Sequence, residues 1–348
     1  MRTLLLRFRA CAVPILAALV VSLATLSAMP VRAQQGYPSR PVQLVVAYPP
    51  GGTGDIVAGL LADRLGSALG QPVRVENRAG ASGAEGARSV ARAAPDGHTL
   101  LLGQTAEIAV APLLGGVGYD PRRDFQPIAL VARIPVALVV QAAAPYASVG
   151  DLLRAARASR RGLLFASAGP GTSGHLAGEL LRMRSPGRLI HVPSEGAGPA
   201  LGELLEGRVD FFFAPLPVAM PEVRSGRLKI LALSSARRAL AVPNVPTIAE
   251  ETGIQGFDIS AWAGVFAPRG TPREIAARLN REINQVVAQP EVRERLVGDG
   301  AELAPMSMEQ FADFVRSEIG RNAELLREQF CMADVRSWWG CFGPGVTP

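Results

Sequence analysis

The stretch at residues 44–69 joins an apolar run, a glycine-rich loop and a helical pattern. Residues 44–48 form a valine-rich run that predicts a strand, which Pro-Pro-Gly-Gly at 49–52 ends. Apolar residues then recur at helical spacing from Val57 to Ala68. The loop therefore brings a helix N-terminus, with its free backbone N–H groups, to the carboxyl edge of a strand. Such a terminus favours a phosphate or carboxylate anion, although an ordinary tight turn has the same pattern.

The same order of strand, polar loop and helix returns along the chain. Strands predicted at 73–77, 98–103 and 163–166 each lead into a loop of small polar residues. This alternation predicts an α/β fold, in which ligands lie at the carboxyl edge of the sheet. Hydroxyl groups in these loops suit a carboxylate held by neutral hydrogen bonds and helix N-termini: Thr53, Thr105, Ser167, Thr172 and Ser173.

The chain length predicts two domains, with the chain crossing between them twice. We place the first crossing near 139–141 and the return before the strand at 257–267. The predicted organisation has four parts: a signal peptide at 1–33, domain one at 34–139 plus 256–330, domain two at 140–255, and a tail at 331–348 without clear periodicity. Cys331 and Cys341 in that tail either form a disulfide or remain free thiols.

The N-terminus has the pattern of a secretory signal peptide. Arg2, Arg7 and Arg9 precede an apolar run at 10–28, and Val-Arg-Ala at 31–33 is a small-x-small cleavage site. We therefore predict export and cleavage near Ala33. Cleavage lowers the 36 basic residues to 32 against 30 acidic ones, so the net charge falls from +6 to +2. This balance and the scarcity of aromatic residues argue against nucleic-acid binding.

One motif supports an enzymatic alternative. The sequence Gly169-x-Gly171-x-x-Gly174 follows a predicted strand, and Glu195 follows the next strand, as in a dinucleotide-binding fingerprint. Pro170 inside the turn and the export signal both argue against a nicotinamide cofactor. An exported enzyme with a nucleotide cofactor stays the alternative to a binding protein.

No other set of residues has the spacing of a catalytic or metal site. His98, His175 and His191 are dispersed, and none has a ligand partner at metal spacing. The loop at 51–55 lacks the lysine of a P-loop, and Asp55 suits the helix dipole better than a general base. We expect no catalytic residue, no metal and no cofactor, which fits binding without chemistry.

A series of short motifs covers most of the chain from Tyr37 to Gln329. In chain order these are Tyr-Pro-x-Arg-Pro-Val at 37–42, Pro-Gly-Gly-Thr-Gly-Asp at 50–55, Gly-Gln-Pro-Val-x-Val-Glu-Asn-Arg at 70–78, Gly-Ala-Ser-Gly at 80–83, Ala-Pro-Asp-Gly-His-Thr-Leu at 94–100, Gly-Pro-Gly-Thr-Ser-Gly-His-Leu at 169–176, His-Val-Pro at 191–193, Val-Pro-Thr-Ile-Ala-Glu at 245–250 and Phe-Ala-Pro-Arg-Gly-Thr-Pro at 266–272. The series resembles the Bug-type extracytoplasmic solute receptors of the tripartite tricarboxylate transporter group.

The resemblance implies a type II-like periplasmic-binding-protein fold with a ligand cleft between two domains joined by two crossovers. It implies a periplasmic receptor, expected as a monomer, that closes on a small carboxylate or related solute and delivers it to membrane transporter subunits. A receptor that serves a signalling partner remains a further alternative. The loops implied to face the cleft complete the expected ligand-binding set: Gly52, Thr53, Gly54, Asp55, Gln104, Thr105, Ser167, Gly171, Thr172, Ser173, Ser194 and Glu195.

The sequence departs from the pattern of that family in two places. Ser194 and Glu195 stand where the family usually has tyrosine and lysine, and Ala214 stands in place of an acidic residue. If Glu195 points into the cleft, it disfavours a dicarboxylate and favours an amide or cationic group. The expected ligand is therefore a small organic acid, an amide or an amino-acid-like solute.

Overall fold

The computed structural model describes residues 36–330, without the side chains of 328–330. The predicted signal peptide and the tail with Cys331 and Cys341 lie outside the described residues. The fold and the site below lie within residues 40–330.

Nine strands in the described part of the chain form one mixed sheet in the order β2-β1-β3-β9-β4-β7-β5-β6, with β8 paired to β4. Their bounds are β1 Val42–Val46, β2 Val73–Asn77, β3 Thr99–Gln104, β4 Phe125–Gln141, β5 Leu163–Ser167, β6 Leu189–Pro193, β7 Phe211–Pro215, β8 Leu228–Leu233 and β9 Ser260–Pro268. The strands β1, β2 and β3 pair in parallel, as do β5, β6 and β7. The predicted α/β class is confirmed.

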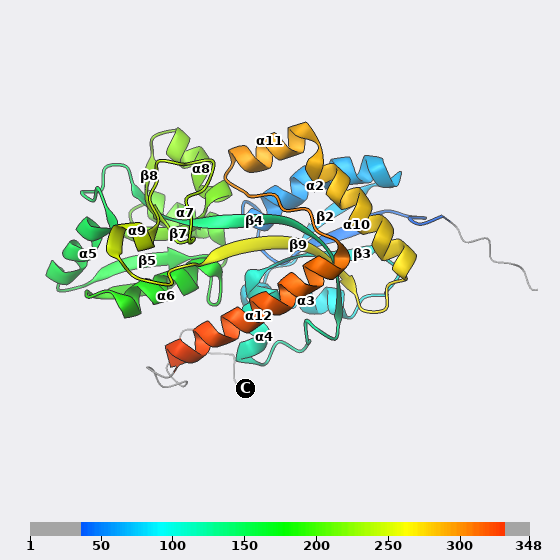
Figure 1. The fold of residues 1–348 in the computed structure, drawn as a ribbon, viewed down its shortest axis with the longest axis horizontal. Coiled ribbons are helices and arrows are strands. Elements are labelled where there is room, and N and C mark those ends of the chain that lie inside the picture. The colour runs from blue at the N-terminus through cyan, green and yellow to red at the C-terminus, as the bar shows by residue number, and fades with distance from the viewer. Residues whose placement is uncertain (1–35, 331–348) are drawn as a thin grey trace, which may run out of the picture. The chain divides into compact units, whose positions relative to one another are not determined.

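Helices follow most of the parallel strands and cover the sheet (Figure 1). Their bounds are α2 Thr53–Leu69, η1 Ala81–Gly83, α3 Ala84–Ala91, the π-helical segment η2 Ala106–Val110, α4 Ala111–Leu114, α5 Val149–Ala158, α6 Ser173–Arg184, α7 Ala197–Leu205, α8 Leu216–Arg224, α9 Ile248–Thr252, α10 Arg273–Ala288, α11 Pro290–Gly298 and α12 Met308–Phe330. The predicted unit at 44–69 is β1, a loop and α2. Gly70, with a φ of 76°, ends α2 in the left-handed conformation that glycine favours.

Two long strands connect the two ends of the sheet. β4 pairs with β9 from Phe125 to Pro135 and with β7 and β8 from Val136 to Gln141. Figure 1 shows β4 and β9 running between the first strand group (β1, β2 and β3) and the second strand group (β5, β6, β7 and β8). The strand β4 changes partners between Pro135 and Val136, before the predicted crossing at 139–141, and the domain limits stay a prediction.

Separate hydrophobic cores support the two strand groups. Val45, Leu101 and Phe266 belong to one cluster beside the first group. In β7, Phe211 and Phe213 pack in one cluster, whereas Phe212 packs in another on the opposite face. This alternation has the period of two that a strand imposes. Each strand group is thus anchored by its own buried side chains.

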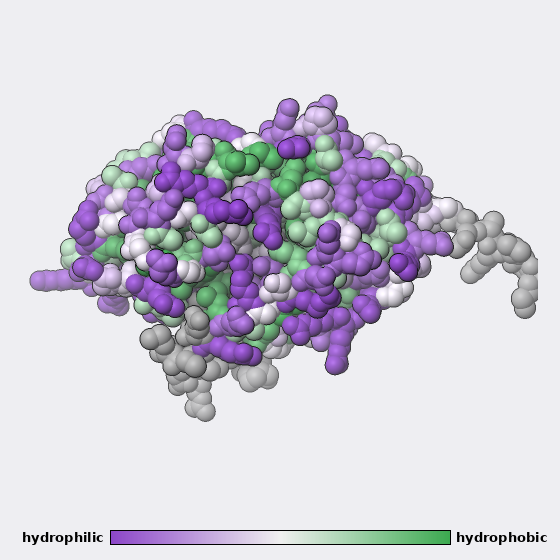
Figure 2. All heavy atoms as spheres, viewed as in Figure 1, coloured by the Kyte–Doolittle hydropathy of each residue, from purple (hydrophilic) through white to green (hydrophobic). Residues whose placement is uncertain are grey.

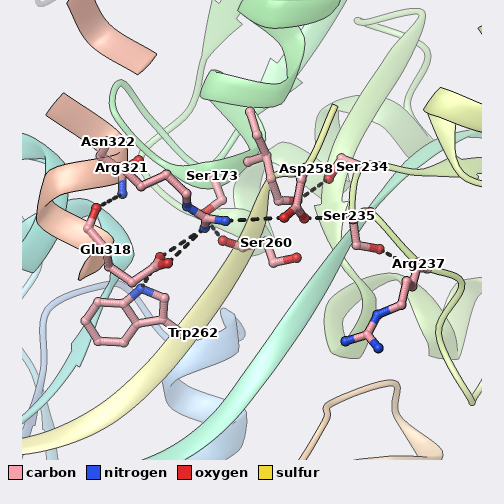
Figure 3. Close-up of polar contacts among 12 residues, drawn as sticks. Ser173, Ser234, Ser235, Arg237, Asp258, Ser260, Trp262, Glu318, Arg321 and Asn322 are labelled. Carbon is pink, nitrogen blue, oxygen red and sulfur yellow. Dashed lines mark hydrogen bonds and ion pairs between the residues drawn. The ribbon is translucent and has the colours of Figure 1, made fainter. Parts of the chain in front are cut away.

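Helix α12 braces β9 where that strand runs between the groups (Figure 3). The indole Nε1 of Trp262 donates a hydrogen bond to Glu318 Oε2 at 3.0 Å. Arg321 of the same helix lies 3.0 Å from Glu318 Oε1 and 3.4 Å from Asp258 Oδ2. The network therefore ties α12 both to β9 and to the segment that precedes β9.

The described residues have the surface of a globular protein. Figure 2 shows hydrophilic residues over most of the visible face, with hydrophobic residues in small groups. Within residues 36–330, no helix is both long and apolar enough to span a membrane.

Candidate functional site

Four α-helices begin at the edge of one narrow cavity of about 50 Å³, here called the inner cavity. Thr53 is the first residue of α2, Ser173 of α6 and Ala197 of α7, and Pro215 is the residue before α8. All four line the inner cavity. The arrangement follows from the topology, because each helix directly follows a strand and parallel strands end at the same edge of a sheet. The helix α2 comes from the first strand group and the other three from the second.

The inner cavity is suited to an anion without a cationic side chain. None of the described residues that line it is a lysine or an arginine. Helix N-termini carry partial positive charge and free N–H donors, and several of them converge here. A group of carboxylate size fits the volume, since one water takes up about 30 Å³ in the liquid.

Four of the predicted residues on the wall of the inner cavity carry a hydroxyl: Thr53, Thr105, Thr172 and Ser173. Among the described residues, only the hydroxyl of Thr53 in this set lacks a hydrogen-bond partner. Its side chain is buried, with the residue 4% exposed, and its Oγ1 is unpaired. By contrast, Thr105 Oγ1 accepts from Trp262 N at 3.1 Å, and Ser173 Oγ donates to Ser260 O at 3.3 Å. Buried hydroxyls are normally paired, so the unpaired Thr53 Oγ1 is available to a ligand in the inner cavity.

A larger cavity of about 890 Å³, here called the outer cavity, adjoins the inner one. The two cavities share the lining residues Tyr48 and Ala168. Most of the outer wall consists of alanine, glycine, proline, leucine and valine, and the charged residues on it are Arg88 and Glu195. A ligand held in the inner cavity thus has space to extend over a mostly apolar surface.

The predicted ligand-binding residues divide into three groups in the structure. Six line the inner cavity: Gly52, Thr53, Gln104, Thr105, Thr172 and Ser173. Ser194 and Glu195 line the outer cavity. The remaining four, which line neither cavity, are Gly54, Asp55, Ser167 and Gly171.

Two of those four residues, Asp55 and Gly54, contact residues that form the cavity wall or the loop before α2. Asp55 accepts hydrogen bonds from Gly51 N at 2.9 Å and from Asn77 Nδ2 at 3.2 Å, so it fixes the loop before α2. Gly54 lies so close to Gln104 that an added Cβ would be 2.9 Å from Gln104 Nε2. These contacts position the cavity wall.

His175 and His191, which are dispersed in sequence, lie in contact in the structure, with ring centroids 4.2 Å apart and the rings tilted by 31°. Burial lowers the pKa of His191 to about 4, and burial together with the neighbouring His191 lowers the pKa of His175 well below its usual range. Both rings are therefore neutral near pH 7. His191 Nε2 lies 2.7 Å from Ser167 Oγ, and His175 Nδ1 accepts from Gly171 N at 3.0 Å. The Gly171 amide is thus already used within the protein, which weakens the dinucleotide interpretation of this loop.

Glu107 is a buried carboxyl that sequence reasoning missed, because its neighbours in sequence give no signal of its partners. Its Oε1 accepts from Gln104 N at 2.7 Å, and Tyr48 Oη lies 3.1 Å from its Oε2. Burial raises the pKa of Glu107 to about 8. The carboxyl behind the cavities is therefore mostly neutral at pH 7 and does not oppose an anion.

The chain is similar in sequence to known proteins. Residues 57–330 match the family model for the tripartite tricarboxylate transporter family receptor. A UPF0065 protein from the tcbD-tcbE intergenic region of Pseudomonas sp. (strain P51) is 40% identical over 316 residues, which cover 90% of this chain and 93% of that protein.

Solved structures show the same fold. Periplasmic binding protein BugD has a TM-score of 0.78 at 33% identity, covering 84% of this chain and 98% of that one. MatC from Rhodopseudomonas palustris with bound malate has a TM-score of 0.77 at 36% identity, covering 83% and 99%. The family resemblance and the two-domain periplasmic-binding-protein fold predicted from the sequence are confirmed.

Proposed function

Since the chain belongs to the receptor family of the tripartite tricarboxylate transporters, we propose that it captures a small organic carboxylate in the inner cavity. One carboxylate group of the ligand accepts hydrogen bonds from the N-termini that converge there. The rest of the ligand occupies the outer cavity. The neighbouring structure of MatC holds malate, which supports a carboxylate ligand.

The unpaired hydroxyl of Thr53 is the observation that carries this proposal. A buried donor without a partner is costly, and a hydrogen bond to a charged group contributes about 1.5–3 kcal/mol. Thr53 Oγ1 lies at the N-terminus of a helix of 17 residues, where the dipole also favours negative charge. The proposed role of Thr53 is to donate this hydroxyl to the ligand carboxylate.

Closure of the cleft accompanies binding in this proposal. The cavity wall includes Thr53 beside the first strand group and Ser173 and Ala197 beside the second. A ligand that contacts both groups favours the closed arrangement, with β4 and β9 as the connections that bend. The predicted domains, 34–139 plus 256–330 and 140–255, are the bodies that would move.

We also propose that the protein acts without catalysis, as a periplasmic monomer that hands its ligand to transporter subunits. The predicted signal peptide with cleavage near Ala33 supports export. Ser167 and His191 lie close enough for a nucleophile and base, but Ser167 is fully buried, and none of the described residues gives His191 an acidic partner. A role with a signalling partner would use the same closure.

Isothermal titration calorimetry with malate, succinate, adipate, glutamate and their monoamides tests the ligand class. Thr53→Val, which keeps the shape of the side chain, should weaken binding of the preferred acid by about tenfold or more. Thr53→Ser is the matched control and should retain most of the affinity. Failure of the wild-type protein to bind any acid in the panel, after removal of retained ligand by unfolding and refolding, would contradict the proposal.

A further inference from the structure

Arg88 has an unusual position on the wall of the outer cavity. It lies near the C-terminus of α3 and is half-buried. Among the described residues that line the outer cavity, Arg88 is the one with a positive charge. Other described arginines without an acidic partner, such as Arg74, Arg157 and Arg188, are exposed to solvent, whereas Arg88 is not. The guanidinium group of Arg88 has no hydrogen bond or ion pair to another residue within 36–330.

An unpaired, half-buried guanidinium is unfavourable unless an anion reaches it. Burial removes part of its hydration, and a protein ion pair does not replace that loss here. Guanidinium groups bind carboxylates through two parallel hydrogen bonds, which gives both strength and directional preference. The natural partner of Arg88 is therefore an anionic group that enters the cavity from solution.

The sizes of the two cavities indicate where that group belongs. The inner cavity, at about 50 Å³, accommodates little more than one carboxylate, whereas the outer cavity measures about 890 Å³. Tyr48 and Ala168 line both, so one ligand can extend from the first into the second. Apolar residues such as Ala47, Ala84 and Leu114 also line the outer cavity.

We propose that Arg88 is a specificity-determining residue that binds a second anionic group of the ligand, at the far end of an apolar spacer. This inference rests on the proposed function and adds a second point of recognition to it. The inner cavity holds the first carboxylate, and the apolar wall contacts the spacer. Arg88 then selects elongated dianions over monoanions of the same length.

The negative charge of Glu195 restricts the position of the second anionic group in the outer cavity. It is exposed, comes from the loop between β6 and α7, and lines the same cavity as Arg88. A second carboxylate close to Glu195 would be repelled, so the preferred position is against α3 and away from that loop. Replacing Glu195 with glutamine should therefore strengthen dianion binding by a factor of about two to five.

The test compares matched ligands by calorimetry. Succinate, adipate and suberate each have a monocarboxylate of equal length, namely butyrate, hexanoate and octanoate. Arg88→Met should weaken binding of the best dicarboxylate by about tenfold or more and change the matched monocarboxylate by less than about threefold. Arg88→Lys keeps the charge but cannot form the two parallel hydrogen bonds of a guanidinium. Its affinity for the dicarboxylate should lie between those of the wild type and Arg88→Met.

Several outcomes would overturn the inference. If the wild-type protein binds the monocarboxylates as tightly as the dicarboxylates, Arg88 does not select a second anion, while the proposed carboxylate receptor stands. If Arg88→Met and Glu195→Gln both weaken all ligands equally and non-additively, the two side chains form an ion pair on closure instead. Retained binding of monocarboxylates by Arg88→Met shows that the variant is folded.

Discussion

Tyr48 Oη lies 3.1 Å from Glu107 Oε2 and 2.9 Å from the carbonyl oxygen of Ser82. The hydroxyl has one proton for two acceptors, so a neutral Glu107, which can donate to Tyr48, leaves Tyr48 free to donate to Ser82. Because Tyr48 lines both cavities, the protonation state of Glu107 affects the wall of the proposed ligand site.

The stability of the protein should fall as the pH rises through the range set by Glu107. Its pKa is raised from 4.5 to about 8, so between these values the unfolded chain has lost a proton that the folded protein keeps. The free energy of unfolding then decreases with pH, by at most about 1.4 kcal/mol per pH unit from this group.

Glu107→Gln mimics the neutral carboxyl and should remove this part of the slope. Urea denaturation of both proteins at pH 5 and pH 8 measures the difference, and Glu195→Gln serves as an exposed control. Parallel pH profiles for wild type and Glu107→Gln would show that Glu107 is ionised in the folded protein.

Acid should destabilise the protein through the paired histidines. The pKa of His191 is lowered from 6.5 to about 4, so below about pH 6.5 the unfolded chain binds a proton that the folded protein does not. The free energy of unfolding that His191 contributes therefore decreases as the pH falls from 6.5 towards 4. His191→Gln should flatten the profile in this window, as followed by thermal unfolding. An unchanged acid slope in the variant would place the sensitivity elsewhere.

The contact of Glu318 with β9 should contribute to global stability (Figure 3). Glu318→Ala leaves the buried Trp262 Nε1 without its acceptor and Arg321 without its nearest acid, at a cost of about 1–3 kcal/mol. The control is Asp313→Asn, which breaks an exposed ion pair with Arg316 on the same helix and should change stability by less than about 0.5 kcal/mol. Equal effects of the two substitutions in chemical denaturation would refute a bracing role for Glu318.

Substitution by alanine should have different effects on stability at two glycines of α2. An added Cβ at Gly54 would lie 2.9 Å from Val46 Cγ1 and from Gln104 Nε2, whereas one at Gly59 has nothing within 4 Å. Gly54→Ala should cost about 1–3 kcal/mol and weaken ligand binding, because Gln104 lines the inner cavity. Gly59→Ala should stabilise the helix by up to about 1 kcal/mol without changing affinity. Circular dichroism melts and calorimetry measure both, and a destabilised Gly59→Ala would contradict this account.

The local units of this fold could be predicted from the sequence because neighbouring residues determine them. The apolar run at 44–48, the glycine loop and the helical spacing after Val57 specify β1, the loop and α2 without any distant contact. The polar loops at strand ends indicated where a ligand would lie. They also supplied six of the residues that line the inner cavity.

The pairing of distant side chains was decided by the tertiary structure alone. His175 and His191 looked dispersed, yet helix α6, which follows β5, places His175 beside His191 of the neighbouring strand β6. Glu107 has no signal in its own segment, because its partner Tyr48 comes from the distant loop after β1. Likewise, the twelve predicted site residues had equal standing in sequence. The structure distinguishes them by their hydrogen bonds. The hydroxyl of Thr53 is buried and unpaired, whereas the carboxylate of Asp55 already accepts a hydrogen bond from the loop. Sequence determines which groups are available, and only packing determines which of them remain unsatisfied.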